Sequence, residues 1–405
     1  MASGELVLFP SLEAAVIGPD RYRLTRKFVD GLEAWASRWP GPFSVVMRPT
    51  EQLTDDLDGV EVGAETDAFR LVVTEDYASV HQPPPGSVWV GMLGFRQNHL
   101  PKLARQRGIA FVTTSEYTLK TRLQIARATE ASRAKRLRRS VWEVEQEAAN
   151  LLGVSASAGI QCNGLPTWRQ YRYLQPDAHL YFDTRARRDM VIDAESLGAK
   201  RDRLRSGAPL RLGFSGRLNE MKGADHLVPV ARTLHARGVP FELHVAGDGV
   251  LRPRLEAEAA DLDGRVRWVG VKDFERELVP WLRNEVDLFV MPHRQGDPSC
   301  TYMETLAGGV PIVGYDNEAC SSFVEHFDVG ASSTLDDPEA LAEVIAELHR
   351  DRPRLDRWAA RAAEVARNGC FESMMQARVE HLQEISSRPG PSPVGRWWRR
   401  RPSRT

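Results

Sequence analysis

The sequence has few cysteines, and they form no metal-binding pattern. The four are scattered along 405 residues, without CxxC spacing and without clustered histidines: Cys162, Cys300, Cys320 and Cys370. Because structural zinc sites need closely spaced ligands, we expect no metal site. Paired cysteines are typical of oxidising compartments, so this pattern favours a reduced, cytosolic protein.

Long apolar runs and a charge excess are also missing. No apolar run reaches the roughly 18 residues that a membrane span requires, and residues 1–10 lack the order of a secretory signal. The formal net charge of −1 gives no general reason to expect nucleic-acid binding. A chain of 405 residues exceeds what one hydrophobic core usually supports, so we expect a soluble protein with two domains.

Buried-strand patterns alternate with helical patterns through most of the chain, which is typical of parallel α/β architecture. The expected strands are 6–9, 43–47, 71–74, 88–92 and 109–113 in the first half, and 210–215, 241–246, 266–269, 288–291 and 311–314 in the second. The expected helices are 22–39, 98–107, 119–152, 224–237, 251–261, 275–284, 299–307, 338–349 and 354–367. The second half predicts a doubly wound sheet, with a binding crevice at the carboxyl ends of its strands.

Changes in composition divide the chain into segments. We expect a first domain over residues 1–185, an interdomain linker rich in Arg and Asp over 186–209, and a second domain over 210–370. From residue 386 a stretch of Pro, Gly and Ser leads to a basic tip, Arg396–Arg401, which contains two tryptophans. Residues 386–405 therefore fit either a disordered, solubilising tail or a contact with an anionic membrane surface.

One motif lies between two expected strands, 288–291 and 311–314. A polar loop with Asp297 and Pro298 leads into a short helix that carries Glu304 and stops at a glycine pair. Free amides at a helix start bind anions. A carboxylate one turn inside such a helix is suited to sugar or ribose hydroxyls rather than to phosphate.

A second motif follows the expected strand 210–215. Gly216 allows a turn, Arg217 and Lys222 lie on the loop, and Gly223 opens the next helix. Two cations beside a helix start suit a diphosphate. The alternative is a pair of ordinary surface cations on a βα loop.

Taken together, the two motifs resemble the donor-binding elements of the retaining family 4 glycosyltransferases (glycosyl transferases group 1). Further matches to this family are the turn at 246–249, Val269-Gly270, the segment 307–311, and the Asn-Gly turn at 163–164. The resemblance is continuous from about residue 159 to residue 314 and weak before that. It implies an α/β GT-B fold, in which two doubly wound Rossmann-like domains face each other across a cleft. It also implies that a C-terminal helix, 371–385, returns to the first domain.

The family resemblance implies a role for each matching position. Arg217 and Lys222 hold the donor diphosphate, and Glu304 accepts hydrogen bonds from the ribose. Donor contacts are also expected from Gly216, from Val269, Gly270 and Val271 near the base, and from Ser299, Cys300 and Thr301 near the sugar or distal phosphate. The donor is a nucleotide-diphosphate sugar as co-substrate, with no cofactor and no metal.

The sequence departs from the family pattern at three places. The first of two glutamates usual in the family is replaced by Gly296, so we assign its role to the adjacent Asp297. The glycine-rich turn expected after strand 311–314 is replaced by residues 315–318. The glycine pair near the N-terminus is reduced to Gly18, which we assign to donor binding.

Signals for an acceptor are weaker. Glu116 follows strand 109–113 and is expected at the crevice, although it also fits a helix cap. His99 is the second acceptor candidate, or only a helix-start histidine. Trp168, Tyr171 and Tyr173 fit either stacking on sugar rings or domain packing.

These observations predict a cytoplasmic, retaining glycosyltransferase, with a peripheral position at the inner face of the plasma membrane if the tail binds lipid. Its acceptor is a saccharide, a lipid-linked sugar or a small molecule, in bacterial polysaccharide or glycoconjugate biosynthesis. Two alternatives remain open: a catalytically degenerate protein that serves as an interaction module, and a sugar-nucleotide epimerase.

Overall fold

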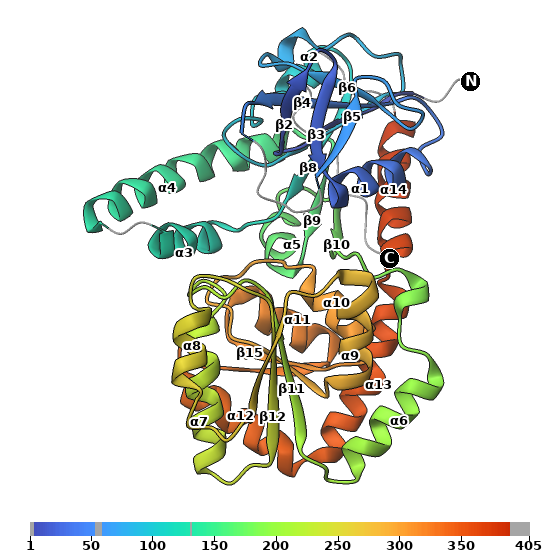
Figure 1. The fold of residues 1–405 in the computed structure, drawn as a ribbon. Coiled ribbons are helices and arrows are strands. Elements are labelled where there is room, and N and C mark those ends of the chain that lie inside the picture. The colour runs from blue at the N-terminus through green and yellow to red at the C-terminus, as the bar shows by residue number, and fades with distance from the viewer. Residues whose placement is uncertain (1–3, 53–58, 130–131, 389–405) are drawn as a thin grey trace, which may run out of the picture.

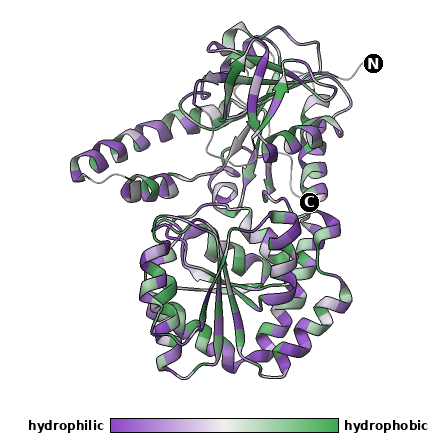
Figure 2. Cartoon of the chain, in the orientation of Figure 1, coloured by the Kyte–Doolittle hydropathy of each residue, from purple (hydrophilic) through white to green (hydrophobic). Residues whose placement is uncertain are grey.

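The computed structural model describes residues 4–52, 59–129 and 132–388, which form two α/β domains, one above the other in Figure 1. The basic tip Arg396–Arg401 lies outside the described residues. Apolar strands fill the interior of each domain, and hydrophilic residues colour the outer helices (Figure 2). Within the described ranges, no helix is both long and apolar enough to cross a membrane.

The first domain is built on a sheet with ten strands among the described residues, in the order β10-β9-β8-β7-β1-β4-β2-β3-β5, with β6 on β4. Its strands are β1 Leu6–Phe9, β2 Glu13–Gly18, β3 Arg21–Thr25, β4 Phe43–Thr50, β5 Gly59–Gly63, β6 Arg70–Val73, β7 Val88–Met92, β8 Ala110–Ser115, β9 Gly159–Asn163 and β10 Ala178–Tyr181. Its helices are α1 Arg26–Ala36, α2 Leu100–Gln106, α3 Leu119–Thr129, α4 Arg133–Ala156 and α5 Leu165–Tyr171. The strands from β10 to β4 run parallel, whereas β3 pairs antiparallel with β2 and β5.

Two helix predictions for this domain were wrong in their bounds. Residues 21–25 form β3 rather than the start of a helix, and α1 begins at Arg26 because Thr25 caps it, its hydroxyl accepting from the amide of Phe28 at 3.3 Å. The single helix expected over 119–152 is two helices, α3 and α4. Strands β2, β3, β5, β9 and β10 were not predicted.

The second domain contains a parallel sheet with six described strands, in the order β13-β12-β11-β14-β15-β16. They are β11 Leu210–Ser215, β12 Phe241–Ala246, β13 Val266–Gly270, β14 Leu288–Met291, β15 Ile312–Tyr315 and β16 Gly330–Ser333. The helices are α6 Ala194–Arg205, α7 Leu227–Ala236, α8 Arg252–Glu258, α9 Val279–Glu285, α10 Thr301–Ala307, α11 Glu318–Phe327, α12 Pro338–Arg350 and α13 Arg352–Asn368; α14 Phe371–Ser387 follows them in the chain. One apolar cluster covers each face of the sheet, which explains why most residues of its central strands are apolar.

The strand order reverses between β11 and β14. In a doubly wound sheet this reversal is the topological switch point, and ligands bind there at the carboxyl ends of the strands. The two loops that leave this point are residues 216–223 and 292–300, the same segments that carry the two sequence motifs.

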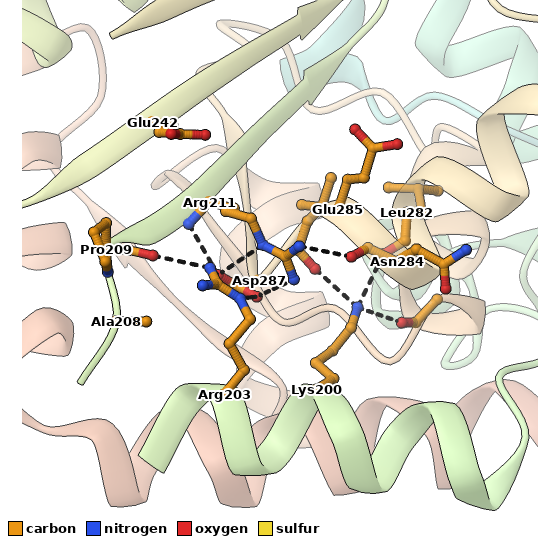
Figure 3. A network of polar contacts seen from close by, with 12 residues as sticks. Lys200, Arg203, Ala208, Pro209, Arg211, Glu242, Leu282, Asn284, Glu285 and Asp287 are labelled. Atoms are coloured by element: carbon orange, nitrogen blue, oxygen red, sulfur yellow. Dashed lines mark hydrogen bonds and ion pairs between the residues drawn. The ribbon is translucent and has the colours of Figure 1, made fainter. Parts of the chain in front are cut away.

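Part of the segment expected as a linker is helix α6, which is anchored to the second domain by a buried cation (Figure 3). Lys200 is 3% exposed, and its ammonium donates to the carbonyls of Leu282, Val286 and Gly308 at 2.7–2.9 Å. Val286 and Gly308 cap the C-terminal ends of α9 and α10. A cation at these ends satisfies carbonyls that a helix leaves unpaired.

The last described helix, α14, leaves the second domain and lies against β7, β8 and β10 of the first. It contributes four buried residues to the apolar core on that face: Met375, Val379, Leu382 and Ile385. The chain therefore passes between the domains twice, once after β10 and once before α14 (Figure 1).

Candidate active site

The loops after β11 and β14 are packed against each other. Gly223 has a left-handed φ of +65°, and a Cβ on it would lie 1.8 Å from the carbonyl oxygen of Pro292. The amide of Arg294 donates to the carbonyl of Met221 at 3.2 Å. Glycine at position 223 is thus required for this backbone approach.

An ion pair joins the same two loops. Lys222 Nζ lies 3.0 Å from Asp297 Oδ2, and both side chains are one-fifth exposed. The amide of Lys222 is held by the Asn219 side chain at 2.9 Å. The structure therefore brings together two residues that were predicted as site residues from separate motifs, while the neighbouring Arg217 is exposed to solvent.

Glu304 is buried on α10, with 4% of its side chain exposed. Its carboxylate accepts two hydrogen bonds from Arg185, from Nε at 2.8 Å and from Nη2 at 3.3 Å. The guanidinium also lies 3.9 Å from the ring centroid of Phe274. Arg185, which comes from the passage between the domains, was not predicted as a site residue.

The helix of the first motif starts two residues later than expected, at Thr301. Ser299 and Thr301 lie at its N-terminal end, and their hydroxyls are 3.0 Å apart. Cys300 caps the helix without a side-chain bond to it, and its thiol instead donates to Asp183 at 2.9 Å. Burial raises the pKa of this thiol.

A charged cluster from the first domain faces this helix start. Lys27, on α1, donates to Asp183 at 3.1 Å and to the sulfur of Cys300 at 3.0 Å. Burial raises the pKa of Glu116 to about 6, and the nearby carboxylates of Asp183 and Asp297 add to the rise. Glu116 therefore lies near Asp297 across the interdomain cleft, together with two residues that the sequence did not suggest, Lys27 and Asp183.

The predicted base-binding segment lies at the carboxyl ends of β12 and β13. Val269 and Gly270 end β13, and the carbonyl of Gly270 accepts from the amide of Gly247 at 2.8 Å. Val271 follows with 66% of its surface exposed, and Val250 nearby is 86% exposed. The turn before Val250 packs on the loop that carries Gly216, since a Cβ at Gly247 would lie 2.0 Å from the carbonyl oxygen of Gly216.

The departures at Gly296 and at 315–318 are explained by one interdomain contact. Glu318, at the start of α11, accepts from Thr118 and from Thr121, the latter at 2.8 Å. A Cβ at position 296 would lie 2.8 Å from both Glu318 Cγ and Thr121 Oγ1. Gly296 therefore leaves room for the contact between the two domains.

Two predicted residues lie in other surroundings. Gly18 ends β2 and pairs with Arg21 in the β2–β3 hairpin. His99 precedes α2 and stacks on Tyr77, with 6.5 Å between the ring centroids. Among the described contacts, neither Gly18 nor His99 touches another predicted site residue. Their assignments to donor and acceptor binding therefore stay predictions.

The three aromatic candidates differ in their surroundings. Tyr171 is fully buried. Arg172 lies over the ring of Trp168 at 4.3 Å and over that of Tyr173 at 4.7 Å. Tyr173 is 80% exposed, so among these three rings it has the most accessible surface.

The second half of the chain is similar in sequence to known glycosyltransferases. Residues 209–351 match the family model described as glycosyl transferases group 1. Amylovoran biosynthesis glycosyltransferase AmsK of Erwinia amylovora is 32% identical over 169 residues, 39% of this chain and 40% of that protein. Alpha-D-kanosaminyltransferase of Streptomyces kanamyceticus is 28% identical over 203 residues, 49% of this chain and 50% of that protein. The matched part of the chain thus spans about half of these curated relatives, or less.

Solved structures resemble nearly the whole chain. HepE of Anabaena in complex with UDP is 12% identical with a TM-score of 0.58, covering 93% of this chain and 98% of that one. Sucrose-phosphate synthase of Thermosynechococcus elongatus is 16% identical with a TM-score of 0.61, covering 94% and 98%. Similarity at this level establishes the fold: the chain has the two-domain GT-B architecture, and the family match lies within its second domain.

Proposed function

We propose that the protein is a retaining family 4 glycosyltransferase that moves a sugar from a nucleotide-diphosphate donor to a glycan, lipid-linked or small-molecule acceptor. The proposal rests on the ion pair between Lys222 and Asp297 at the switch point, with Glu304 on the helix that follows. Cations for a diphosphate and carboxylates for hydroxyls thus lie at one edge of one sheet. The curated relatives named above are bacterial glycosyltransferases, one of them in polysaccharide biosynthesis.

The reaction requires stabilisation of the departing nucleotide. Negative charge grows on the diphosphate as the bond to the anomeric carbon breaks, and preorganised cations stabilise that charge. Lys222 is fixed by the Asn219 and Asp297 contacts, and Arg217 is accessible beside it. The exposed surface of Val271 and Val250 suits the flat apolar face of a base.

The acceptor approaches from the first domain. Glu116, Asp183 and Lys27 offer two carboxylates and a cation opposite the start of α10. Carboxylates at this place accept hydrogen bonds from sugar hydroxyls. In this proposal the donor phosphate takes the acceptor proton, so Glu116 positions the acceptor and no metal takes part.

The proposal is tested by thermal unfolding with UDP, GDP, ADP, CMP and their common sugar conjugates. A ligand at 100 times its Kd stabilises the folded protein by about 2.7 kcal/mol. Lys222→Met should remove the shift, because the diphosphate loses its fixed cation. Lys102→Met, which replaces an exposed lysine on α2, should retain it. Turnover is then measured with the nucleotide sugar that binds.

A second candidate is a non-catalytic interaction module. It is favoured by the engagement of Glu304 with Arg185 and of Lys222 with Asp297, because both groups are satisfied within the chain. Folded wild-type protein that responds to no nucleotide in the panel would support this candidate and contradict the transferase.

A further inference from the structure

Helices α3 and α4 project together from the side of the first domain, away from both sheets (Figure 1). Helix α4 runs from Arg133 to Ala156 and is among the longest described helices. Its first turns lie at the outer end of this arm, and its last turns reach the domain at β9.

The polar side of α4 is its buried side. Glu143 and Glu147 are buried and both pair with Arg122 of α3, Glu143 at 3.1 Å. Asn150, 1% exposed, accepts from the Asn98 side chain at 2.7 Å. Hydrogen-bonded and charged groups therefore help to hold this part of the helix to its own domain.

The apolar side of the same helix faces solvent. We define the α4 stripe as five exposed residues at alternating spacings of four and three: Leu137, Val141, Val144, Ala148 and Leu151. Leu137 is 68% exposed, Val141 51% and Val144 53%. Residues at this spacing share one helix face, so the stripe is continuous. An exposed, continuous apolar face in a folded protein marks an interaction surface.

Positive charge surrounds the outer half of the α4 stripe. The first seven residues of α4 include five cations: Arg133, Lys135, Arg136, Arg138 and Arg139. Arg133 is four residues before Leu137, and Arg138 is three before Val141, so both lie beside the stripe. Among the acidic residues of α4, Glu145 is the exposed one, and it lies near the α4 stripe.

We propose that α4 docks on an anionic lipid surface, with the stripe in the headgroup region and the cations on lipid phosphates. Apolar residues on one helix face, with basic residues beside them, give interfacial binding to anionic membranes. A second copy of the chain fits less well. A parallel pairing would set the five cations against each other, and an antiparallel pairing about Val144 would set Glu145 against its own copy.

The test is flotation of the full chain with vesicles of phosphatidylcholine alone or mixed with phosphatidylglycerol. We expect binding to the mixed vesicles, weakened by salt. Leu137→Gln/Val141→Gln/Val144→Gln should reduce the partition coefficient about tenfold or more. Arg133→Gln/Lys135→Gln/Arg138→Gln should reduce it about fivefold per cation. Because these side chains are exposed, the thermal midpoint should not change. The matched control, Val16→Gln/Leu335→Gln, replaces exposed apolar residues elsewhere and should bind as wild type does.

A tail variant separates the helix from the basic tip of the sequence. Arg399→Gln/Arg400→Gln/Arg401→Gln should leave most of the binding that depends on the stripe. The proposal is overturned if the wild-type protein does not bind the mixed vesicles, or if the variant with the stripe substitutions binds them as strongly as the wild-type protein does. It is also overturned if the tail variant alone abolishes binding. A dimer in light scattering that the stripe variant converts to monomer, without lipid binding, assigns the stripe to a second copy instead.

Discussion

Arg185 holds Glu304 with two hydrogen bonds, at 2.8 and 3.3 Å, across 119 positions of sequence. The arginine comes from the passage between the domains, and the glutamate from the helix at the switch point. The guanidinium is planar and matches a carboxylate with two parallel bonds. The contact therefore fixes the orientation of the carboxylate that we assign to the ribose and ties it to the position of the first domain.

Replacing Arg185 with methionine should destabilise the protein. Removing one partner of a buried pair costs about 3–5 kcal/mol, but Arg185 is 39% exposed, so we expect about 2 kcal/mol. Urea unfolding of Arg185→Met, Glu304→Gln and the double variant measures the coupling. Single-variant losses that simply add would show that the two side chains do not depend on each other.

Glu116→Gln should make stability less dependent on pH. The folded-state pKa rises from its ordinary 4.5 to about 6, so the folded protein binds more protons than the unfolded chain between these values. Stability from this group is therefore present below pH 4.5 and is lost as pH rises to about 6. We expect the variant to equal wild type near pH 4 and to exceed it at pH 7 by on the order of 1 kcal/mol. A stability difference that is the same at both pH values would contradict the assignment.

Lys200→Met should be among the most damaging single changes. It leaves the carbonyls of Leu282, Val286 and Gly308 buried without their donor, and each unsatisfied group costs about 1–3 kcal/mol. The thermal midpoint should fall far below that of Asp202→Asn, a control on the exposed side of α6. Equal midpoints for the two variants would show that the carbonyls find other partners.

Gly223→Ala should abolish nucleotide binding as well as lower stability. A methyl group there meets the Pro292 carbonyl, so the loops after β11 and β14 must separate. Gly207→Ala is the matched control, because its φ is +73° but the space around it is open. The control should lose only about 1–2 kcal/mol, the cost of a left-handed alanine. Nucleotide binding by Gly223→Ala at wild-type affinity would show that loop contact is not needed for the site.

The sequence predicted the second domain well because its strands are buried on both faces. The runs at 210–215, 241–246 and 288–291 are mostly apolar, and the structure confirms all three as strands. In contrast, β2 and β3 carry polar side chains and pair at one end of the sheet. The residues of β3, Arg21–Thr25, fit the start of the following helix as well as they fit a strand.

The residues that we assign to the donor could be proposed from the sequence because they lie close together in it, within two short loops. The cluster of Lys27, Asp183 and Cys300 was not, since its members are separated by up to 273 positions and meet only when the domains are docked. From the sequence, Gly296 was interpreted as the loss of a glutamate that is usual in the family. The structure gives a steric reason for glycine at this position, because Thr121 and Glu318 are in contact beside it. Such a reason depends on tertiary packing and leaves no local pattern.

The return of α14 has a consequence for biosynthesis. The core of the first domain includes Met375, Val379, Leu382 and Ile385, which leave the ribosome after all strands of both sheets. Domains usually fold in the order of their synthesis. Here we expect the second domain to complete its core first, while the earlier half of the nascent chain waits with one apolar face uncovered until its last helix emerges.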